Sequence, residues 1–271
     1  MAIAVCVHFP KGQFIDFNNN EAKRYWEMEE KQKKILNILM AAVLLASMYL
    51  AAQQGAVCVN SGSVATENAD KENQGNQKYC VVIDAGHGGA DPGKVGINGA
   101  LEKDINLQIA EKLKTFLGAS DVKVVMTRTD DGGLYDENAS NKKVQDMKRR
   151  IAIIEEAQPE LVVSIHQNSY HEEYVNGAQV FYYNGSESSK RLAELLQKRF
   201  VINVDPENKR EAKGNDSYYL LKKTSRPIVI VECGFLSNAA EAEKLATPIY
   251  QEKAAWAIHM GIMQYLNTDK K

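Results

Sequence analysis

Residues 79–89 read YCVVIDAGHGG, an apolar run that ends in an aspartate and leads into a glycine-rich turn around His87. Short runs rich in Val and Ile are typical of strands buried on both faces of a sheet. Four further runs share this composition: 122–127, 161–165, 178–183 and 227–231. Segments with the helical spacing of apolar residues alternate with them, at 105–116, 147–154, 192–200 and 249–266. The pattern predicts an α/β fold, a mostly parallel twisted sheet with helices on both faces.

Composition excludes several classes of protein. The 271 residues are 44% hydrophobic and 25% charged, as in a soluble globular domain rather than a disordered chain or a multi-span membrane protein. Lys and Arg number 33 against 35 Asp and Glu, so no basic excess favours nucleic-acid binding. The four cysteines form no C-x-x-C pair, which argues against a thiolate metal site and a disulfide framework.

One segment is apolar enough to cross a membrane. Residues 35–52 read ILNILMAAVLLASMYLAA, eighteen residues without a charge, close to the length that spans a bilayer core. Lysines precede it and residues 53–70 contain no Lys or Arg, so the positive-inside rule places the N-terminus in the cytoplasm. We expect a cytoplasmic segment at 1–34 and a transmembrane signal anchor at 35–52. A buried core helix is the alternative, and translation starting at Met28 would give a shorter cytoplasmic segment.

The residues after this segment divide into a tether and a domain. Residues 53–78 are polar and contain little to bury, so they are expected to form a flexible linker. No small-x-small cleavage site follows the apolar segment, which favours an uncleaved anchor. Residues 79–271 are then an exported catalytic domain of about 190 residues, enough for one hydrophobic core without disulfides.

Polar residues gather where the predicted strands end. His87 follows the first run, His166 follows the third in SIHQNS, and Glu232 follows PIVIV. Glu102 stands where the helix after the glycine-rich turn begins. The carboxyl ends of parallel strands face one crevice, so the two imidazoles and two carboxylates are expected to converge there.

Such a group of residues can support metal-assisted hydrolysis. Two His and one Glu match a catalytic zinc set that leaves a fourth position for water, and the remaining carboxylate can accept a proton from that water. Phosphate binding is the alternative for a glycine-rich turn, although residues 86–93 fit neither the Walker spacing nor G-x-G-x-x-G. Glu102 alone could also simply favour the helix dipole.

At these positions the chain resembles a known family. The order DAGHGGADPG, LEKDINL, VVMTRTDD, SIHQNS, GAQVFYY and VECGFLSN is similar to that of zinc-dependent N-acetylmuramoyl-L-alanine amidases of amidase family 3. The resemblance covers residues 79–266 and implies one zinc ion. Carried over by position, it makes His87, Glu102 and His166 the zinc ligands and Glu232 the catalytic carboxylate.

The resemblance also implies a substrate and a setting. Through LEKDINLQIAEKL, SYYLLKK and KLATPIYQEKAAWAIHMGI the chain is similar to germination-specific spore-cortex amidases of endospore formers. These relatives imply cleavage of the amide between the muramic acid lactyl group and L-alanine of peptidoglycan, as a step towards muramic lactam, in the spore cortex or the intermembrane space. A zinc peptidase of the cell wall and a non-catalytic wall-binding module remain as alternatives. No activating protein partner can be inferred.

Stem peptides carry free carboxylates, which a basic residue could bind. Arg210 and Lys213 lie just before the SYYLLKK stretch, which resembles the edge of the family's groove. Arg can hold a carboxylate through its planar fork, and Lys can add a point charge. We expect these two residues to contact substrate, with a solvated basic loop as the alternative.

Overall fold

The computed structural model describes residues 5–6, 16–17, 31 and 78–268. The chain divides into two compact units, Met1–Glu72 and Asn73–Lys271. In the first unit β1 (Val5–Cys6) pairs antiparallel with β2 (Asp16–Phe17), a pair that the sequence does not predict. The expected membrane anchor at 35–52 lies outside the described residues, as does the expected linker apart from Lys78. Within the described part of the chain, no helix has both the length and the apolar character of a membrane span.

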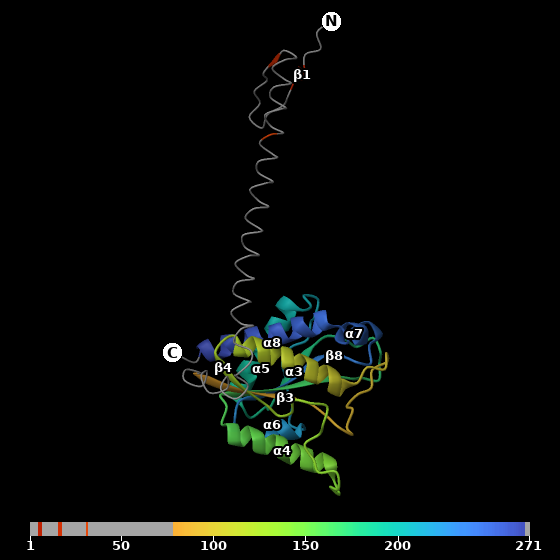
Figure 1. Cartoon of the computed structure of the whole chain (residues 1–271), viewed down its shortest axis with the longest axis vertical. Helices are drawn as coiled ribbons and strands as arrows, with labels where there is room; N and C mark the ends of the chain where they lie inside the picture. Colours follow the sequence, from red (N-terminus) through yellow and green to blue (C-terminus); the bar gives the residue numbers. More distant parts are fainter. Residues whose placement is uncertain (1–4, 7–15, 18–30, 32–77, 269–271) are drawn as a thin grey trace, which may run out of the picture. The chain divides into compact units, whose positions relative to one another are not determined.

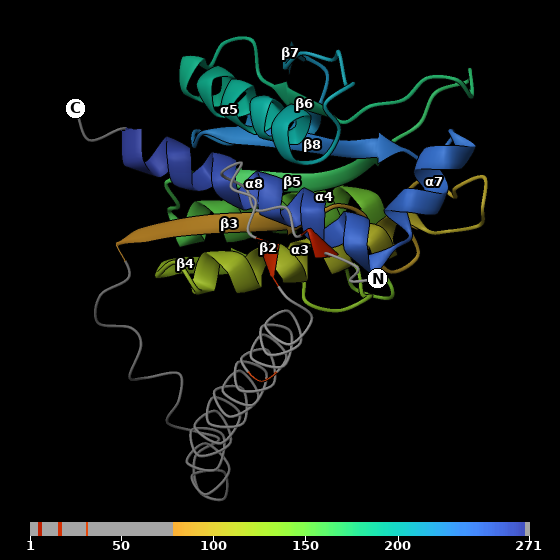
Figure 2. The ribbon, with the colours of Figure 1, turned by 90° about the horizontal axis from the view of Figure 1, so that it is seen from above.

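The second unit is built on a six-stranded sheet with the order β4-β3-β5-β8-β6-β7. Its strands are β3 (Tyr79–Ala85), β4 (Val122–Met126), β5 (Leu161–Asn168), β6 (Gln179–Tyr182), β7 (Lys213–Gly214) and β8 (Ile228–Phe235). β4, β3, β5 and β8 run parallel, whereas β6 pairs antiparallel with β8 and parallel with β7. Figure 2 shows β4, β3, β5 and β8 side by side. The predicted α/β fold with a mostly parallel sheet is confirmed.

Helices cover both faces of this sheet. They are α3 (Glu102–Gly118), α4 (Lys142–Ala157), α5 (Glu187–Asn203), α6 (Tyr219–Lys223), α7 (Ala239–Leu245) and α8 (Pro248–Thr268). In Figure 1, α3, α5 and α8 lie above the sheet, and α4 and α6 lie below it. α5 is capped by Ser186, which accepts a hydrogen bond from the Ser189 amide, and α4 is capped by Asn141 in the same way.

The alternation of side chains along the strands separates two apolar clusters. Val81 and Ile83 of β3 pack into the cluster under α3, α5 and α8, whereas Val82 packs into the smaller cluster under α4 and α6. All eight residues of β8 are buried, so this central strand is apolar on both faces except at Glu232. Because four strands run in the same direction, their carboxyl ends meet at one edge of the sheet, where the candidate site lies.

Candidate metal centre and active site

His87 stands on a tight loop directly after β3. Its backbone has φ 63°, and Gly88 and Gly89 follow with φ 139° and 59°. Left-handed backbone of this kind is unfavourable for a histidine and ordinary for glycine, so the surrounding structure must hold His87 in place. Arg150 of α4 donates hydrogen bonds to the carbonyl oxygens of His87 at 2.6 Å and of Ala85 at 2.7 Å.

Glu102 is the first residue of α3 and is 4% exposed. Its Oε1 lies 3.2 Å from His87 Nε2 and 3.0 Å from His166 Nδ1, and it accepts a hydrogen bond from the Gln167 amide at 3.0 Å. Its Oε2 accepts a hydrogen bond from the Lys94 amide at 2.7 Å. Burial by itself raises the pKa of Glu102, but its contacts with His166 and His87 outweigh burial and hold the pKa well below the usual range. Glu102 is therefore a carboxylate.

His166 projects from β5 beside the loop of His87. The two imidazole rings meet edge to face, with centroids 5.0 Å apart and planes at 78°. Gly86 lies directly against the His166 ring, so a Cβ atom at that position would overlap the imidazole. The loop thus requires glycine at residue 86 for close packing.

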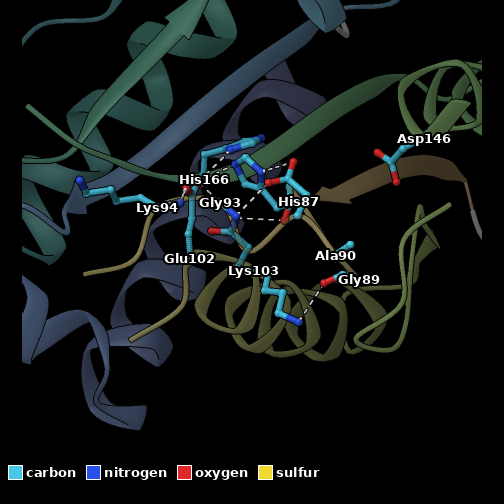
Figure 3. Close-up of polar contacts among 12 residues, drawn as sticks. His87, Gly89, Ala90, Gly93, Lys94, Glu102, Lys103, Asp146 and His166 are labelled. Atoms are coloured by element: carbon cyan, nitrogen blue, oxygen red, sulfur yellow. Dashed lines mark hydrogen bonds and ion pairs between the residues drawn. The ribbon is translucent and has the colours of Figure 1, made fainter. Parts of the chain in front are cut away.

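Together, His87, Glu102 and His166 fit a divalent metal ion (Figure 3). One ligand atom from each residue can be chosen so that all three lie within 4.8 Å of one another. For metal–ligand bonds of about 2.0–2.1 Å, the edges of a tetrahedron are about 3.3 Å long. The separations of 3.2 Å and 3.0 Å from Glu102 to the two imidazole nitrogens are close to this length. Asp91 contacts Nδ1 of His87 at 3.0 Å and orients this ring from behind, as is usual for metal-binding histidines.

Glu232 of β8 lies beside this group. It is the register partner of His166 on the neighbouring strand, and only 7% of it is exposed. Its Oε2 has no hydrogen-bond partner among the described residues. Burial raises the pKa of Glu232 to about 7, with the charge of Glu102 adding to the rise and the two imidazoles opposing it. A buried carboxylate that is left unpaired in this way has the properties of a general base.

The site opens into a cavity of about 440 Å³. His87, His166 and Glu232 line it together with Tyr218 of the segment before α6. Burial raises the pKa of Tyr218 to about 12, with a further contribution from the charge of Glu232, so its hydroxyl keeps its proton. The ring of Tyr218 packs edge to face on Phe181, with centroids 5.6 Å apart.

A buried ionic network lies beneath the glycine-rich loop, and the sequence does not predict it. Arg150 is 2% exposed and donates to Asp84 Oδ1 at 2.7 Å and to Asp146 Oδ2 at 2.6 Å. Ser164 donates to the other oxygen of Asp84 at 2.5 Å. Arg128 donates to the carbonyls of Ala85 and Gly86. Two arginines therefore fix the backbone that carries His87.

Arg210 and Lys213 do not line the cavity. The Arg210 guanidinium donates to the carbonyl oxygen of Asn176 at 2.6 Å and to Gln179 Oε1 at 3.2 Å, and it lies over the ring of Phe235 at 4.6 Å. Lys213 is exposed in β7. Their expected contact with substrate remains a prediction.

Comparison with known proteins agrees with this site. Residues 81–264 match the family model of N-acetylmuramoyl-L-alanine amidases. The germination-specific N-acetylmuramoyl-L-alanine amidase of Bacillus subtilis strain 168 is 36% identical over 188 residues, which cover 68% of this chain and 78% of that protein. N-acetylmuramoyl-L-alanine amidase LytC of the same strain is 34% identical over 76% of this chain and 39% of its own length.

Solved structures are similar as well. The CwlD amidase of Clostridioides difficile, solved in complex with the GerS lipoprotein, has 41% identity and a TM-score of 0.69, over 70% of this chain and all of that chain. The catalytic domain of the amidase CwlV from Bacillus (Paenibacillus) polymyxa has 33% identity and a TM-score of 0.62, over 70% of this chain and 98% of that one. The chain therefore belongs to the N-acetylmuramoyl-L-alanine amidases, enzymes that hydrolyse the bacterial cell wall.

Proposed function

We propose that this amidase depends on one zinc ion held by His87, Glu102 and His166, and that Glu232 is its catalytic base. The observation that carries the proposal is the pairing of a three-donor group with an unpartnered buried carboxylate on the adjacent strand. When bound, zinc would polarise the amide carbonyl and lower the pKa of water to about 7.

The residues of the chain itself would perform the proton transfers. Glu232 Oε2 is available to take the proton of the attacking water and return it to the leaving nitrogen of L-alanine. Asp91 holds the His87 ring, and Arg150 and Arg128 hold the loop beneath it. The cavity provides a partly enclosed space in which the muramoyl peptide can be oriented.

We further propose that the substrate is the amide between the muramic acid lactyl group and L-alanine in spore-cortex peptidoglycan, so that the product leads to muramic lactam. The similarity to the germination-specific amidase of B. subtilis supports this setting. The apolar residues 35–52 would anchor the catalytic domain outside the cytoplasmic membrane, with 53–78 as its tether. Intact-mass measurement of the native protein would test the anchor and the start at Met28.

Digestion of purified cortex peptidoglycan, followed by mass analysis, tests the reaction. Release of whole stem peptides together with a free lactyl carboxylate is expected. Release of terminal amino acids alone would show a peptidase, and no release would favour a wall-binding module. Zinc titration of the same protein should saturate near one equivalent, and His87→Ala should abolish both binding and cleavage, whereas His171→Ala, at an exposed imidazole outside the cavity, should change neither.

A further inference from the structure

The cavity beside the metal ligands has a second polar group of lining residues. Lys142 and Lys143 of α4, together with Tyr135, line the same space as His87 and Glu232. Apolar side chains complete its walls, among them Met147, Leu220 and Ile230. A volume of about 440 Å³ falls within the range of roughly 300–1,000 Å³ that is usual for pockets holding a small ligand.

Almost every charged residue that lines this cavity has a partner of opposite charge. Asp84 and Asp146 pair with Arg150, and Asp91 pairs with His87. Lys142 lies 3.3 Å from Glu137 and over the ring of Tyr135.

Two charged lining residues are left. Glu232 has an unpartnered oxygen, and Lys143 forms no ion pair within 4.0 Å with any residue in the described part of the chain. The proposed reaction uses Glu232 and leaves Lys143 unexplained.

The position of Lys143 does not serve the stability of its helix. Helix N-termini favour anions and acidic side chains, yet the first turn of α4 has no acidic residue and begins with two lysines. At this end of α4, the unpaired ammonium group of Lys143 adds to the positive end of the helix dipole, an arrangement that attracts a carboxylate.

The chemistry of the substrate class indicates what would bind there. Before cleavage, the lactyl carboxyl group of muramic acid is part of the amide bond, so the glycan side next to that bond offers no carboxylate. Free carboxylates are found on the stem peptide. A cationic group in the cavity therefore distinguishes the peptide side of the scissile bond from the glycan side.

We propose that Lys143 binds a free carboxylate of the stem peptide and selects for it, so that the peptide lies on the α4 side of the cavity and the glycan strand on the opposite side of the metal ligands. The proposal rests on the proposed amidase function and adds a specificity-determining residue to it. It also assigns an orientation to the substrate.

Two muramoyl peptides of equal length test it, one with D-glutamate as its second residue and one with D-isoglutamine, which differ in one carboxylate. Wild-type full-length protein should cleave the D-glutamate form with about tenfold higher kcat/KM, the size of one partly exposed charge-assisted contact. Lys143→Gln should remove this preference, mainly through KM. Lys148→Gln, an exposed site on α4 outside the cavity, makes the same change of charge and should keep it.

Calorimetry of the binding of the two free stem peptides separates the proposal for Lys143 from the proposed amidase function. Tighter binding of the D-glutamate peptide that depends on Lys143, without cleavage of either muramoyl peptide, would support the carboxylate site and reject the amidase proposal. Equal cleavage of both forms by the wild type, or an equal loss for both in Lys143→Gln, would overturn the role of Lys143.

Discussion

The two faces of the sheet are built differently. The face under α3, α5 and α8 holds a continuous cluster of 31 buried apolar residues among those described, whereas the cluster under α4 and α6 holds eight. On this second face Arg150 and Asp84 are buried as an ion pair, and the cavity opens beside them. Since buried apolar area supplies most of the free energy of folding, the first face stabilises the domain and the second face is available for chemistry.

The largest expected effect is on turnover. Glu232→Gln keeps the shape of the side chain but removes the base, so kcat should fall about 10²–10⁴-fold while metal content is retained. Loss of a buried, unpartnered carboxylate should leave Tm unchanged or raise it. Steady-state kinetics, metal analysis and thermal unfolding measure these quantities. Activity near the wild-type level would remove Glu232 from the mechanism.

Next in size is the ion pair beneath the loop. Arg150→Met should lower the free energy of unfolding by about 3–5 kcal/mol, because it leaves Asp84 charged and buried. It should also weaken metal binding, since the His87 carbonyl loses its donor. The double variant with Asp84→Asn should recover part of the stability. Full additivity of the two single changes would show that the pair is not coupled.

The same pair predicts a pH dependence of stability. Burial opposes ionisation of Asp84, but the charge of Arg150 and the hydrogen bond from Ser164 prevail and lower its pKa to about 2. Its stabilising contribution is therefore complete above the ordinary carboxyl pKa of about 4 and is lost as the pH falls from there towards about 2. Unfolding of the wild type and of Asp84→Asn at a series of acidic pH values measures the difference in their free energies of unfolding. This difference should vanish as the pH approaches about 2.

A matched pair of core substitutions sharpens the comparison of the faces. Leu196→Ala in α5, where Gly261 packs closely on the leucine, should lower the free energy of unfolding by about 2–5 kcal/mol and leave kcat/KM within about twofold. Leu221→Ala in α6, next to the cavity-lining Leu220, should lower both stability and kcat/KM. Equal losses of kcat/KM in the two variants would mean that stability and catalysis are not divided between the two faces of the sheet.

The smallest effect concerns Arg210. A substrate contact predicts kcat/KM about tenfold lower in Arg210→Ala with unchanged Tm. The bonds of its guanidinium to Asn176 and Gln179 and its stacking on Phe235 indicate a structural role instead, which predicts a lower Tm with kcat/KM within about twofold. Parallel kinetics and unfolding of this single variant distinguish the two.

The sequence predicts which residues meet at the carboxyl edge of the sheet better than it predicts what lies beneath them. The expected strand ends are too early, because β5 and β8 continue past His166 and Glu232, which lie within these strands. His87, His166 and Glu232 follow apolar runs, so a parallel sheet brings them to one edge without knowledge of the packing. In the sequence, Arg150 follows Arg149, which is exposed, so the sequence alone indicates that both belong to a solvated basic stretch. Its spacing of three from Met147 and four from Ile154 places it on the apolar face of α4, and this was the available signal. The antiparallel direction of β6 could not be predicted from the hydrophobic pattern. Side chains alternate with period two in parallel and in antiparallel strands alike, so the pattern is the same for both directions.

The close contact of Gly86 with the His166 imidazole has a consequence for ion selection. The His166 ring occupies the space that a Cβ at residue 86 would fill, so it packs directly against the backbone of the loop. Part of the entropy cost of ordering this ring is then met when the domain folds, and binding of an ion would not require that ordering again. Large oxygen-seeking ions such as calcium require six to eight ligands at about 2.3–2.6 Å, which are more oxygen donors than two imidazoles and one carboxylate offer. Selectivity of the proposed zinc site among ions would thus depend in part on the absence of a side chain at residue 86.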